Sequence, residues 1–336
     1  MFRETQLMLK SFSHLLFGSL TILGTIGSAN LAQGAQLLMI PDSLNDSILL
    51  FDSYDGALVD DNFIDGSGIF QTPLNAIQVN NEIWVSDQLA DSIFRFNFNG
   101  KLLSTISSGL DNIRGMAFIG DRVYVTNAGT NNNAPGAGIV TFDTNGNNLD
   151  FFAIGSPYDI LFYNGELLIS NVADENLERY SLDGVFLGTF HDSDGVTGID
   201  FPQQLATRGD SNVLAAGFSN PAGIYEYDSD GTEIGLYTSV QGVANRGIRG
   251  VYELGNGNIL WTGGDGVVST NITVGSPKFA SFTDIYTRQS LECTTACVSA
   301  RFIDPLQVPE PGSIFGLLTF GFLGASSFLK GKSYQK

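Results

Sequence analysis

A pattern that returns six times along the middle of the chain constrains this sequence more than any other feature. An apolar run that ends in a small or polar residue finishes at positions 42, 87, 127, 171, 217 and 263, which are spaced by 45, 40, 44, 46 and 46 residues. The stretches Trp-Val-Ser-Asp at 84–87 and Leu-Ile-Ser-Asn at 168–171 are two of the copies. Such self-similarity indicates an array of similar structural units.

Each period contains enough strand signals for a four-stranded sheet. In five of the six repeats a shorter apolar segment precedes the main run, as at 73–77, and most repeats continue into another strand and a turn, as at 93–100 and 224–231. The Asn-Gly and Asp-Gly pairs in these turns supply the positive φ that hairpins need. We therefore predict an all-β fold, a single six-bladed β-propeller over residues 37–304.

The two ends of the repeated region complement each other. The first repeat lacks the leading segment, and one such segment is left over at the far end, at residues 297–303. If the left-over strand joins the first blade, the two open sheet edges pair with each other and the ring closes. The sequence predicts this closure.

The charge of the chain restricts its partners. Outside the two ends, residues 37–308 contain 11 basic and 33 acidic residues, a formal charge of −22. A field of this sign keeps a protein soluble and repels nucleic acid and anionic lipid. We expect no nucleic-acid partner.

Residues 1–36 have the order of a secretory signal peptide. Arg3 and Lys10 precede an apolar run around residues 15–24, and small residues follow at 27–29. A basic start, an apolar centre and small residues at the cleavage site define such signals. We expect cleavage after Ala29 or at a position up to Ala35. A permanent N-terminal membrane helix is the alternative.

Residues 305–336 contain three features in a fixed order. The motif Val-Pro-Glu-Pro-Gly-Ser at 308–313 precedes an apolar segment at 314–329, and lysines follow in a basic end at 330–336. An apolar helix of that length spans about 24 Å, less than the ~30 Å hydrocarbon core of a bilayer. Basic residues after such a segment stay on the cytoplasmic side.

Pro309, Glu310 and Pro311, the short apolar helix and the basic end together resemble the PEP-CTERM sorting signal of exopolysaccharide-producing bacteria. The resemblance implies a partner, a membrane-bound exosortase, which processes the tail near the motif. It also implies export across the inner membrane, a transient membrane anchor through the tail, and a final place at the cell surface or in the extracellular matrix. The basic end here is lysine only, whereas the family more often has an arginine-containing cluster. A permanent C-terminal anchor is the alternative.

The repeat length and the strand that ends in Asn or Asp resemble the NHL-repeat and gluconolactonase-like propellers. A gluconolactonase-like activity implies a metal held in the channel by carboxylate and amide groups. The only candidate set here is Asp159 with Asn75, Asn127 and Asn171, and the first-blade glutamate of that family has no counterpart. The sequence therefore predicts no resident metal and no cofactor.

Two further motifs have structural and functional alternatives. Cys293 and Cys297 predict a local disulfide, because an exported protein meets an oxidising compartment, and a pair of free thiols is the alternative. Asp-Ser-Asp-Gly at 192–195 and 228–231 predicts turns, with a calcium contact as the alternative. Neither copy continues to the glutamate of a calcium loop.

Aligning the leading segments on their apolar residue places a polar residue two positions before it in every repeat. Innermost strands line the channel of a propeller, so we expect these residues to form a polar ring at one mouth. Arg114 and Arg249 share the context Ile-Arg-Gly in blades three and six, which face each other across the axis. The six residues are Asn75, Arg114, Asp159, Gln204, Arg249 and Arg301.

Three arginines that converge within an acidic protein suit a carboxylate or sulfate ligand, because the guanidinium fork matches such oxyanions. The alternative is that each arginine bonds neighbouring carbonyls, or pairs with Asp159, to satisfy the channel. His191 is the only histidine outside the signal, which disfavours histidine-based catalysis. We predict a non-enzymatic exported protein that binds an exopolysaccharide component, an acidic saccharide. A metal-dependent gluconolactonase-like hydrolase is the alternative.

Overall fold

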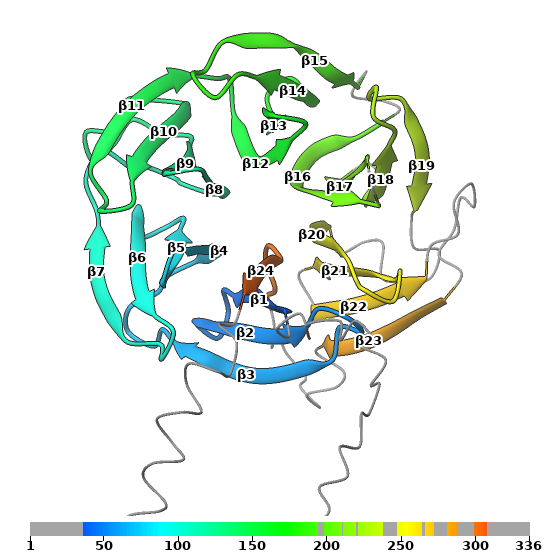
Figure 1. Ribbon diagram of the computed structural model, residues 1–336, viewed down its shortest axis with the longest axis horizontal. Helices are drawn as coiled ribbons and strands as arrows, with labels where there is room; N and C mark the ends of the chain where they lie inside the picture. Colours follow the sequence, from blue (N-terminus) through cyan, green and yellow to red (C-terminus); the bar gives the residue numbers. More distant parts are fainter. Residues whose placement is uncertain are drawn as a thin grey trace, which may run out of the picture. The chain divides into compact units, whose positions relative to one another are not determined.

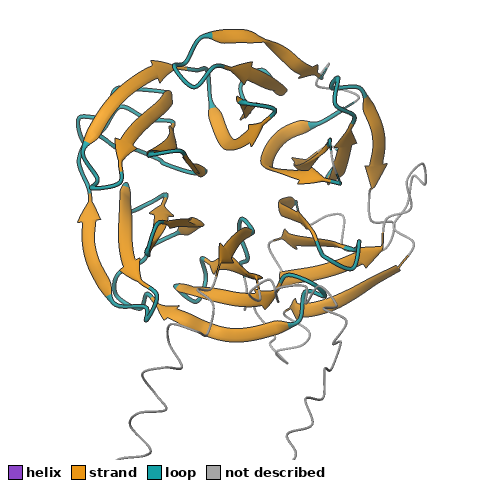
Figure 2. Cartoon of the chain, viewed as in Figure 1, coloured by secondary structure: helices purple, strands orange, loops and turns teal. Residues whose placement is uncertain are grey.

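The structure, a computed structural model, describes residues 36–193, 198–209, 211–219, 221–237, 247–263, 266–271, 281–287 and 299–307. The predicted signal peptide up to residue 35, Cys293 and Cys297, and the sorting tail from residue 308 onward lie outside these residues. The described part is all β, with six four-stranded antiparallel sheets around one axis (Figures 1 and 2). No helix within it reaches the length and apolarity that crossing a bilayer requires. The prediction of a six-bladed β-propeller is confirmed.

The blades follow one another in chain order around the ring (Figure 1). Blade 1 contains β1 (Gln36–Asp42), β2 (Ser47–Asp52), β3 (Leu58–Asp65) and β24 (Asp304–Gln307). Blade 2 contains β4 (Pro73–Val79), β5 (Glu82–Asp87), β6 (Ser92–Asn97) and β7 (Leu102–Ile106), and blade 3 contains β8 (Met116–Ile119), β9 (Arg122–Asn127), β10 (Gly138–Asp143) and β11 (Asn148–Ala153).

The second half of the ring repeats this plan. Blade 4 contains β12 (Pro157–Tyr163), β13 (Glu166–Asn171), β14 (Asn176–Tyr180) and β15 (Phe186–Asp192). Blade 5 contains β16 (Asp200–Arg208), β17 (Asn212–Ser219), β18 (Gly223–Tyr227) and β19 (Glu233–Tyr237). Blade 6 contains β20 (Ile248–Glu253), β21 (Ile259–Gly263), β22 (Gly266–Asn271) and β23 (Ser281–Thr287).

The hydrophobic core lies between the blades. Among the described residues, each pair of neighbouring blades encloses one cluster of buried apolar side chains. The second strand of a blade, such as β5 or β13, is buried over nearly its whole length, whereas the outermost strands β3, β7 and β11 are mostly exposed. Burial on both faces explains why the inner strands are continuous apolar runs and do not alternate.

The ring closes through β24, which pairs antiparallel with β1 so that Leu38 lies opposite Pro305. The closing strand thus belongs to blade 1, as predicted, but it begins at Asp304 and not within residues 297–303. The predicted boundary at 304 falls on its first residue. Pro305 made this segment a poor strand candidate, yet a proline is tolerated because the innermost strand has a neighbour on one side only.

The repeated strand ending has two structural roles. In blades 2, 3 and 6 its penultimate hydroxyl donates to a carbonyl of the next blade, as in the 2.6 Å bond from Ser86 Oγ to the Arg114 carbonyl. Its final Asp or Asn accepts hydrogen bonds from the loop that leads into the innermost strand, as Asp87 does from the backbone N–H groups of Gln71 and Thr72. The repeat that identified the fold is therefore the set of contacts that joins the blades.

Candidate functional site: the two mouths of the central channel

The six predicted channel residues do not form a single ring. Ile77 on β4 pairs with Trp84, three residues before the strand ending Asp87, whereas Met116 on β8 pairs with Val125, two residues before Asn127. Aligning the repeats on the apolar residue therefore shifts blade 3 by one position, and blades 6 and 1 by the same amount. In the observed register Gly115, Gly250 and Phe302 are equivalent to Asn75, Asp159 and Gln204.

Asn75, Asp159 and Gln204 are buried and connect the innermost strands to one another. Asn75 Oδ1 accepts a 2.8 Å hydrogen bond from the Met116 N–H, and Asp159 Oδ2 accepts one of the same length from the Leu205 N–H. Gln204 Oε1 accepts from the N–H groups of both Val251 (3.1 Å) and Ile303 (2.9 Å). These side chains hold the ring together, because each satisfies a buried backbone donor of another blade.

Glycines at the equivalent positions make room for these side chains. A Cβ at Gly115 would lie 2.3 Å from Asp159 Oδ1, and a Cβ at Gly250 would lie 2.9 Å from Gln204 Oε1. Both distances are below normal van der Waals contact. The Ile-Arg-Gly sequence of blades 3 and 6 thus combines a residue that faces the mouth with a glycine that accepts a neighbour's side chain.

A second carboxyl, which the sequence did not indicate, lies beside this layer. Asp304, the first residue of β24, accepts a 2.5 Å hydrogen bond at Oδ2 from Asn75 Nδ2. Burial raises the pKa of Asp159 to about 7, although hydrogen bonds from Leu205 and Ile160 oppose the rise. Burial and then the charge of Asp159 raise the pKa of Asp304 well above its ordinary value. At neutral pH the pair therefore retains at least one proton.

Arg114, Arg249 and Arg301 lie one residue before that layer, at equivalent positions in blades 3, 6 and 1. We call this end of the channel, where the innermost strands begin, the arginine mouth. Arg114 Nη1 donates to the Pro157 carbonyl at 3.2 Å, Arg249 Nη1 to Ser299 Oγ at 2.8 Å, and Arg301 Nε to Ser43 Oγ at 2.7 Å. All three side chains are half-buried.

Aromatic rings connect two of the three guanidinium groups, those of Arg114 and Arg249. The Arg114 guanidinium lies 4.6 Å from the centre of the Tyr158 ring, and that of Arg249 lies 5.6 Å from the Phe218 ring. Phe201 lies between the two aromatic rings, 5.6 Å from each centroid to centroid. Tyr158 also contacts Phe302 at 6.0 Å, across the axis from blade 4 to blade 1. The arginine mouth therefore combines cations with an aromatic floor.

The charges at this mouth act on each other. Burial, and then the charge of Arg249, lower the pKa of Arg301 to about 10. Burial also lowers the pKa of Arg114 below its ordinary value, and its Nε is a buried donor without an acceptor among the described residues. Neither Arg114 nor Arg301 forms an ion pair with a described carboxylate. The structural alternative was that each arginine bonds neighbouring carbonyls or pairs with Asp159. Arg114 does bond a neighbouring carbonyl, that of Pro157, whereas an ion pair with Asp159 is not observed for Arg114 or Arg301.

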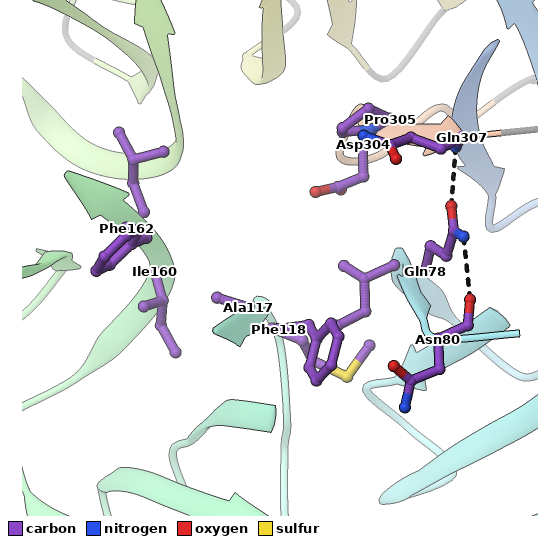
Figure 3. Close-up of a pocket in the computed structure, with 12 residues that line it drawn as sticks. Gln78, Asn80, Ala117, Phe118, Ile160, Phe162, Asp304, Pro305 and Gln307 are labelled. Atoms are coloured by element: carbon purple, nitrogen blue, oxygen red, sulfur yellow. Dashed lines mark hydrogen bonds between the residues drawn. The ribbon is translucent and has the colours of Figure 1, made fainter. Parts of the chain in front are cut away.

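The opposite end of the channel, where the innermost strands end, contains a cavity of about 510 Å³ (Figure 3). A second lobe of about 340 Å³ adjoins it, and both lobes are lined by Leu161, Asp304 and Pro305. We call this end the carboxyl mouth. The remaining walls of the larger lobe are mostly apolar, with Phe118 and Phe162 opposite the Asp304 side (Figure 3).

The other candidates from the sequence have structural roles. Asn127 donates to the carbonyls of Gly129 and Gly136, and Asn171 accepts from the Ser156 N–H, so the amides proposed for a metal site cap loops of their own blades. No group of three or more potential metal-binding His, Cys, Asp or Glu residues occurs among the described residues.

The remaining loop motifs also have local partners. His191 lies on β15 and not in a loop, with its ring 4.4 Å from that of Tyr227. Asp228 accepts from the Asp230 and Thr232 N–H groups, which confirms turn chemistry at 228–231. The other copy extends beyond the described residues.

No family model and no curated protein matches this sequence. Solved structures share the fold: a Bacteroides caccae protein of unknown function has a TM-score of 0.56 at 13% identity, covering 82% of this chain and 100% of that one. A chain of a nidogen/laminin complex has a TM-score of 0.59 at 14% identity, covering 80% and 98%. Streptogramin B lyase has a TM-score of 0.50 at 12% identity, covering 74% of each chain. The likeness establishes the six-bladed propeller fold. It does not establish an activity.

Proposed function

We propose that this protein is an exported, non-enzymatic propeller of the cell surface or extracellular matrix that binds an acidic saccharide at the arginine mouth. The observation that carries the proposal is the placement of Arg114, Arg249 and Arg301 at one register of three innermost strands, around a common aromatic floor. The other three blades have uncharged residues at this register: Leu74 in blade 2, Tyr158 in blade 4 and Gln203 in blade 5.

Electrostatics supports an anionic ligand. Burial, and then the charge of Arg249, lower the pKa of Arg301, so an anion that enters between the two guanidinium groups relieves a cost already present in the protein. The Nε of Arg114 has no acceptor among the described residues, so the hydrogen-bonding capacity of this guanidinium group is not saturated. Carboxylates and sulfates fit best, because their paired oxygens match the guanidinium fork.

The aromatic floor supports a sugar as the carrier of that anion. Tyr158, Phe201 and Phe218 lie beside the arginines and contact one another. Aromatic side chains of this kind can pack against the flat apolar face of a sugar ring. A uronic acid has both an apolar ring face and a carboxylate. The composition of an exopolysaccharide that contains uronic acids therefore suits this mouth.

Calorimetric titration with uronic-acid oligosaccharides tests the proposal. Charged hydrogen bonds contribute roughly 1.5–3 kcal/mol each, so Arg114→Ala or Arg249→Ala should weaken binding by about ten- to a hundredfold. Arg179→Ala is the matched control, because Arg179 pairs with Glu166 on the outer part of blade 4, away from the channel. Absence of binding, or equal weakening in all three variants, would contradict the proposal.

The export part of the proposal rests on the two chain ends. We propose that residues 1–36 direct secretion and that an exosortase processes the tail at Pro309, Glu310 and Pro311. Mass spectrometry of protein from the native host should find a mature chain that lacks residues 1–29 and 314–336. Recovery of the intact chain would overturn this part and leave the ligand proposal to its own test.

A further inference from the structure

The larger lobe at the carboxyl mouth has the dimensions of a small-molecule site. Its volume of about 510 Å³ lies within the range of about 300–1,000 Å³ typical of ligand pockets. Apolar walls come from three blades, with Ile77 on β4, Met116 and Phe118 on β8, and Leu161 and Phe162 on β12. Phe162 is 47% exposed although it is a large apolar residue, so part of this wall is uncovered.

One polar group of this lobe is directed at a ligand. The Asp304 carboxyl points into the cavity from β24 (Figure 3), and its hydrogen bond among the described residues comes from Asn75. The amide of Gln78 at the rim is already used, since it accepts from the Gln307 N–H at 2.8 Å and donates to the Asn80 carbonyl at 3.0 Å. Asp304 is the one ionisable residue among the residues that line this lobe.

The charge around Asp304 has one sign. The charge of Asp159 on β12 acts on it, and Glu253 on β20 lines the second lobe beside Tyr252. Glu253 is bonded by Arg208 Nε at 3.4 Å and by the Gly209 N–H at 2.7 Å. No Lys, Arg or His is among the lining residues of either lobe, and β4 and β8 contribute only uncharged side chains. The two channel carboxyls therefore lack a lining cation.

We propose that the cavity at the carboxyl mouth binds a small organic cation, a primary ammonium group on an apolar body, with the ammonium on Asp304 and the body against Phe118, Leu161 and Phe162. An ammonium donates three hydrogen bonds and neutralises the carboxyl pair, which a neutral ligand does not do. A bare metal ion fits less well, because the walls offer hydrocarbon where a metal ion requires several oxygen ligands. This site is separate from the arginine mouth and does not depend on the function proposed there.

Binding of a cation must release a proton from the carboxyl pair. Burial and mutual repulsion keep the pair partly protonated at neutral pH, and an ammonium favours the ionised form. Affinity for the cation therefore rises as pH rises toward neutrality, by up to about tenfold per pH unit for each proton released. A neutral ligand has no such dependence.

Three probes with the same aromatic body test the proposal by calorimetry on the purified protein: 2-phenylethylammonium, 2-phenylethanol and 3-phenylpropanoate. We expect the cation to bind at least about tenfold more tightly than the alcohol at pH 7.5, and the anion to bind weakest. At pH 6.5 the binding enthalpy of the cation should differ between phosphate and Tris buffers, because one proton passes to the buffer. Equal affinities for the cation and the alcohol, or no buffer dependence, would overturn the proposal.

Variants assign the two parts of the site. Asp304→Asn should abolish the preference for the cation over the alcohol. Phe162→Ala should lower the affinity for the cation and for the alcohol alike, by about three- to tenfold. Asp121→Asn removes an exposed carboxyl on blade 3 and serves as the control. If Asp304→Asn does not fold, the buffer experiment on the unaltered protein decides by itself. A retained cation preference in folded Asp304→Asn would contradict the assignment of the head group.

Discussion

The two mouths of the channel are built from the same six strands but differ in charge. At the arginine mouth three of six equivalent positions hold a guanidinium group, in a molecule whose propeller region has a formal charge of −22. At the carboxyl mouth the positions equivalent to Asp304 are Ile77, Ala117, Leu161, Ala206 and Tyr252, so one acid stands among uncharged residues. In a repeat fold, the residues that depart from the repeat mark candidate sites.

The two departures differ in how the protein accommodates them. The arginines are half-buried and bonded to hydroxyl and carbonyl oxygens, and the guanidinium groups of Arg114 and Arg249 lie over aromatic rings. Asp159 and Asp304 hold protons to a higher pH than free carboxyls do, because burial raises the pKa of both. We therefore expect a change at the arginine mouth to alter mainly ligand binding, and a change near the carboxyl layer to alter mainly stability.

Removal of the closing strand should have the largest effect on both mouths. A chain that ends at Ile303 lacks Asp304 and leaves β1 and the cluster around Leu306 open, whereas a chain that ends at Gln307 retains both. We expect the shorter chain to aggregate or to unfold without cooperativity, because an open ring exposes a sheet edge. Thermal unfolding of both chains checks this. Equal melting would contradict the closure.

The carboxyl layer should make the propeller more stable in mild acid than at neutral pH. Because the pKa of Asp159 is raised in the folded state from 3.8 to about 7, the folded state binds the proton more tightly than the unfolded state. The stabilisation is complete below about pH 4 and is lost as pH rises to about 7, by up to roughly 4 kcal/mol for this group.

Denaturant unfolding between pH 5 and pH 8 measures this slope. Asp159→Asn stays neutral throughout and should remove the part of the slope that belongs to Asp159. An unchanged slope in Asp159→Asn, or stability that rises with pH over this interval, would show that the carboxyl is ionised at both ends of the range.

A methyl group added at Gly115 should destabilise the ring by a smaller amount. The Cβ would lie 2.3 Å from Asp159 Oδ1 and 2.8 Å from the Tyr158 carbonyl, so Asp159 must move and its bond to the Leu205 N–H lengthens. We expect Gly115→Ala to cost about 1–3 kcal/mol in the free energy of unfolding. Gly155→Ala is the control, since its nearest atoms lie 3.4 Å away. Equal losses in the free energy of unfolding for the two substitutions would contradict the claim that Gly115 makes room for the Asp159 side chain.

The smallest expected effect separates charge from geometry at the arginine mouth. Arg114→Lys keeps the positive charge but loses the planar fork and the contact with the Tyr158 ring, so it should recover only part of the affinity lost in Arg114→Ala. Titration of the same uronic-acid oligosaccharide against both variants measures the difference. Full recovery with lysine would mean that charge alone holds the ligand.

The repeat in the sequence was sufficient to predict the blades and the ring closure, because one strand ending recurs, and in blades 2, 3 and 6 its hydroxyl bonds a carbonyl of the next blade. It was not sufficient for the register of the innermost strands. Met116, Val251 and Ile303 are apolar and were aligned with Ile77, although the residues equivalent to Ile77 are Ala117, Tyr252 and Asp304. The alignment therefore slipped by one position in blades 3, 6 and 1. The sequence did not indicate Asp304 as a site residue, because Pro305 made its segment a poor strand candidate.

The two cavity lobes also could not be predicted from the sequence. Their lining depends on which side chains of six different strands face the same space, and one residue of shift exchanges the two faces of a strand. The arginines were found because three of them stand in equivalent positions, which is visible in a sequence once the period is known.

A cross-titration of the two mouths tests the central claim, that they are independent sites for ligands of opposite charge. The uronic-acid oligosaccharide and 2-phenylethylammonium are each titrated against the unaltered protein, Arg114→Ala and Asp304→Asn. We predict that Arg114→Ala lowers the affinity for the saccharide by about ten- to a hundredfold and leaves the affinity for the cation unchanged. We predict that Asp304→Asn removes the preference for the cation over the alcohol and leaves the affinity for the saccharide unchanged. Loss of both ligands in either variant, or binding of neither ligand to the unaltered protein, would contradict the account.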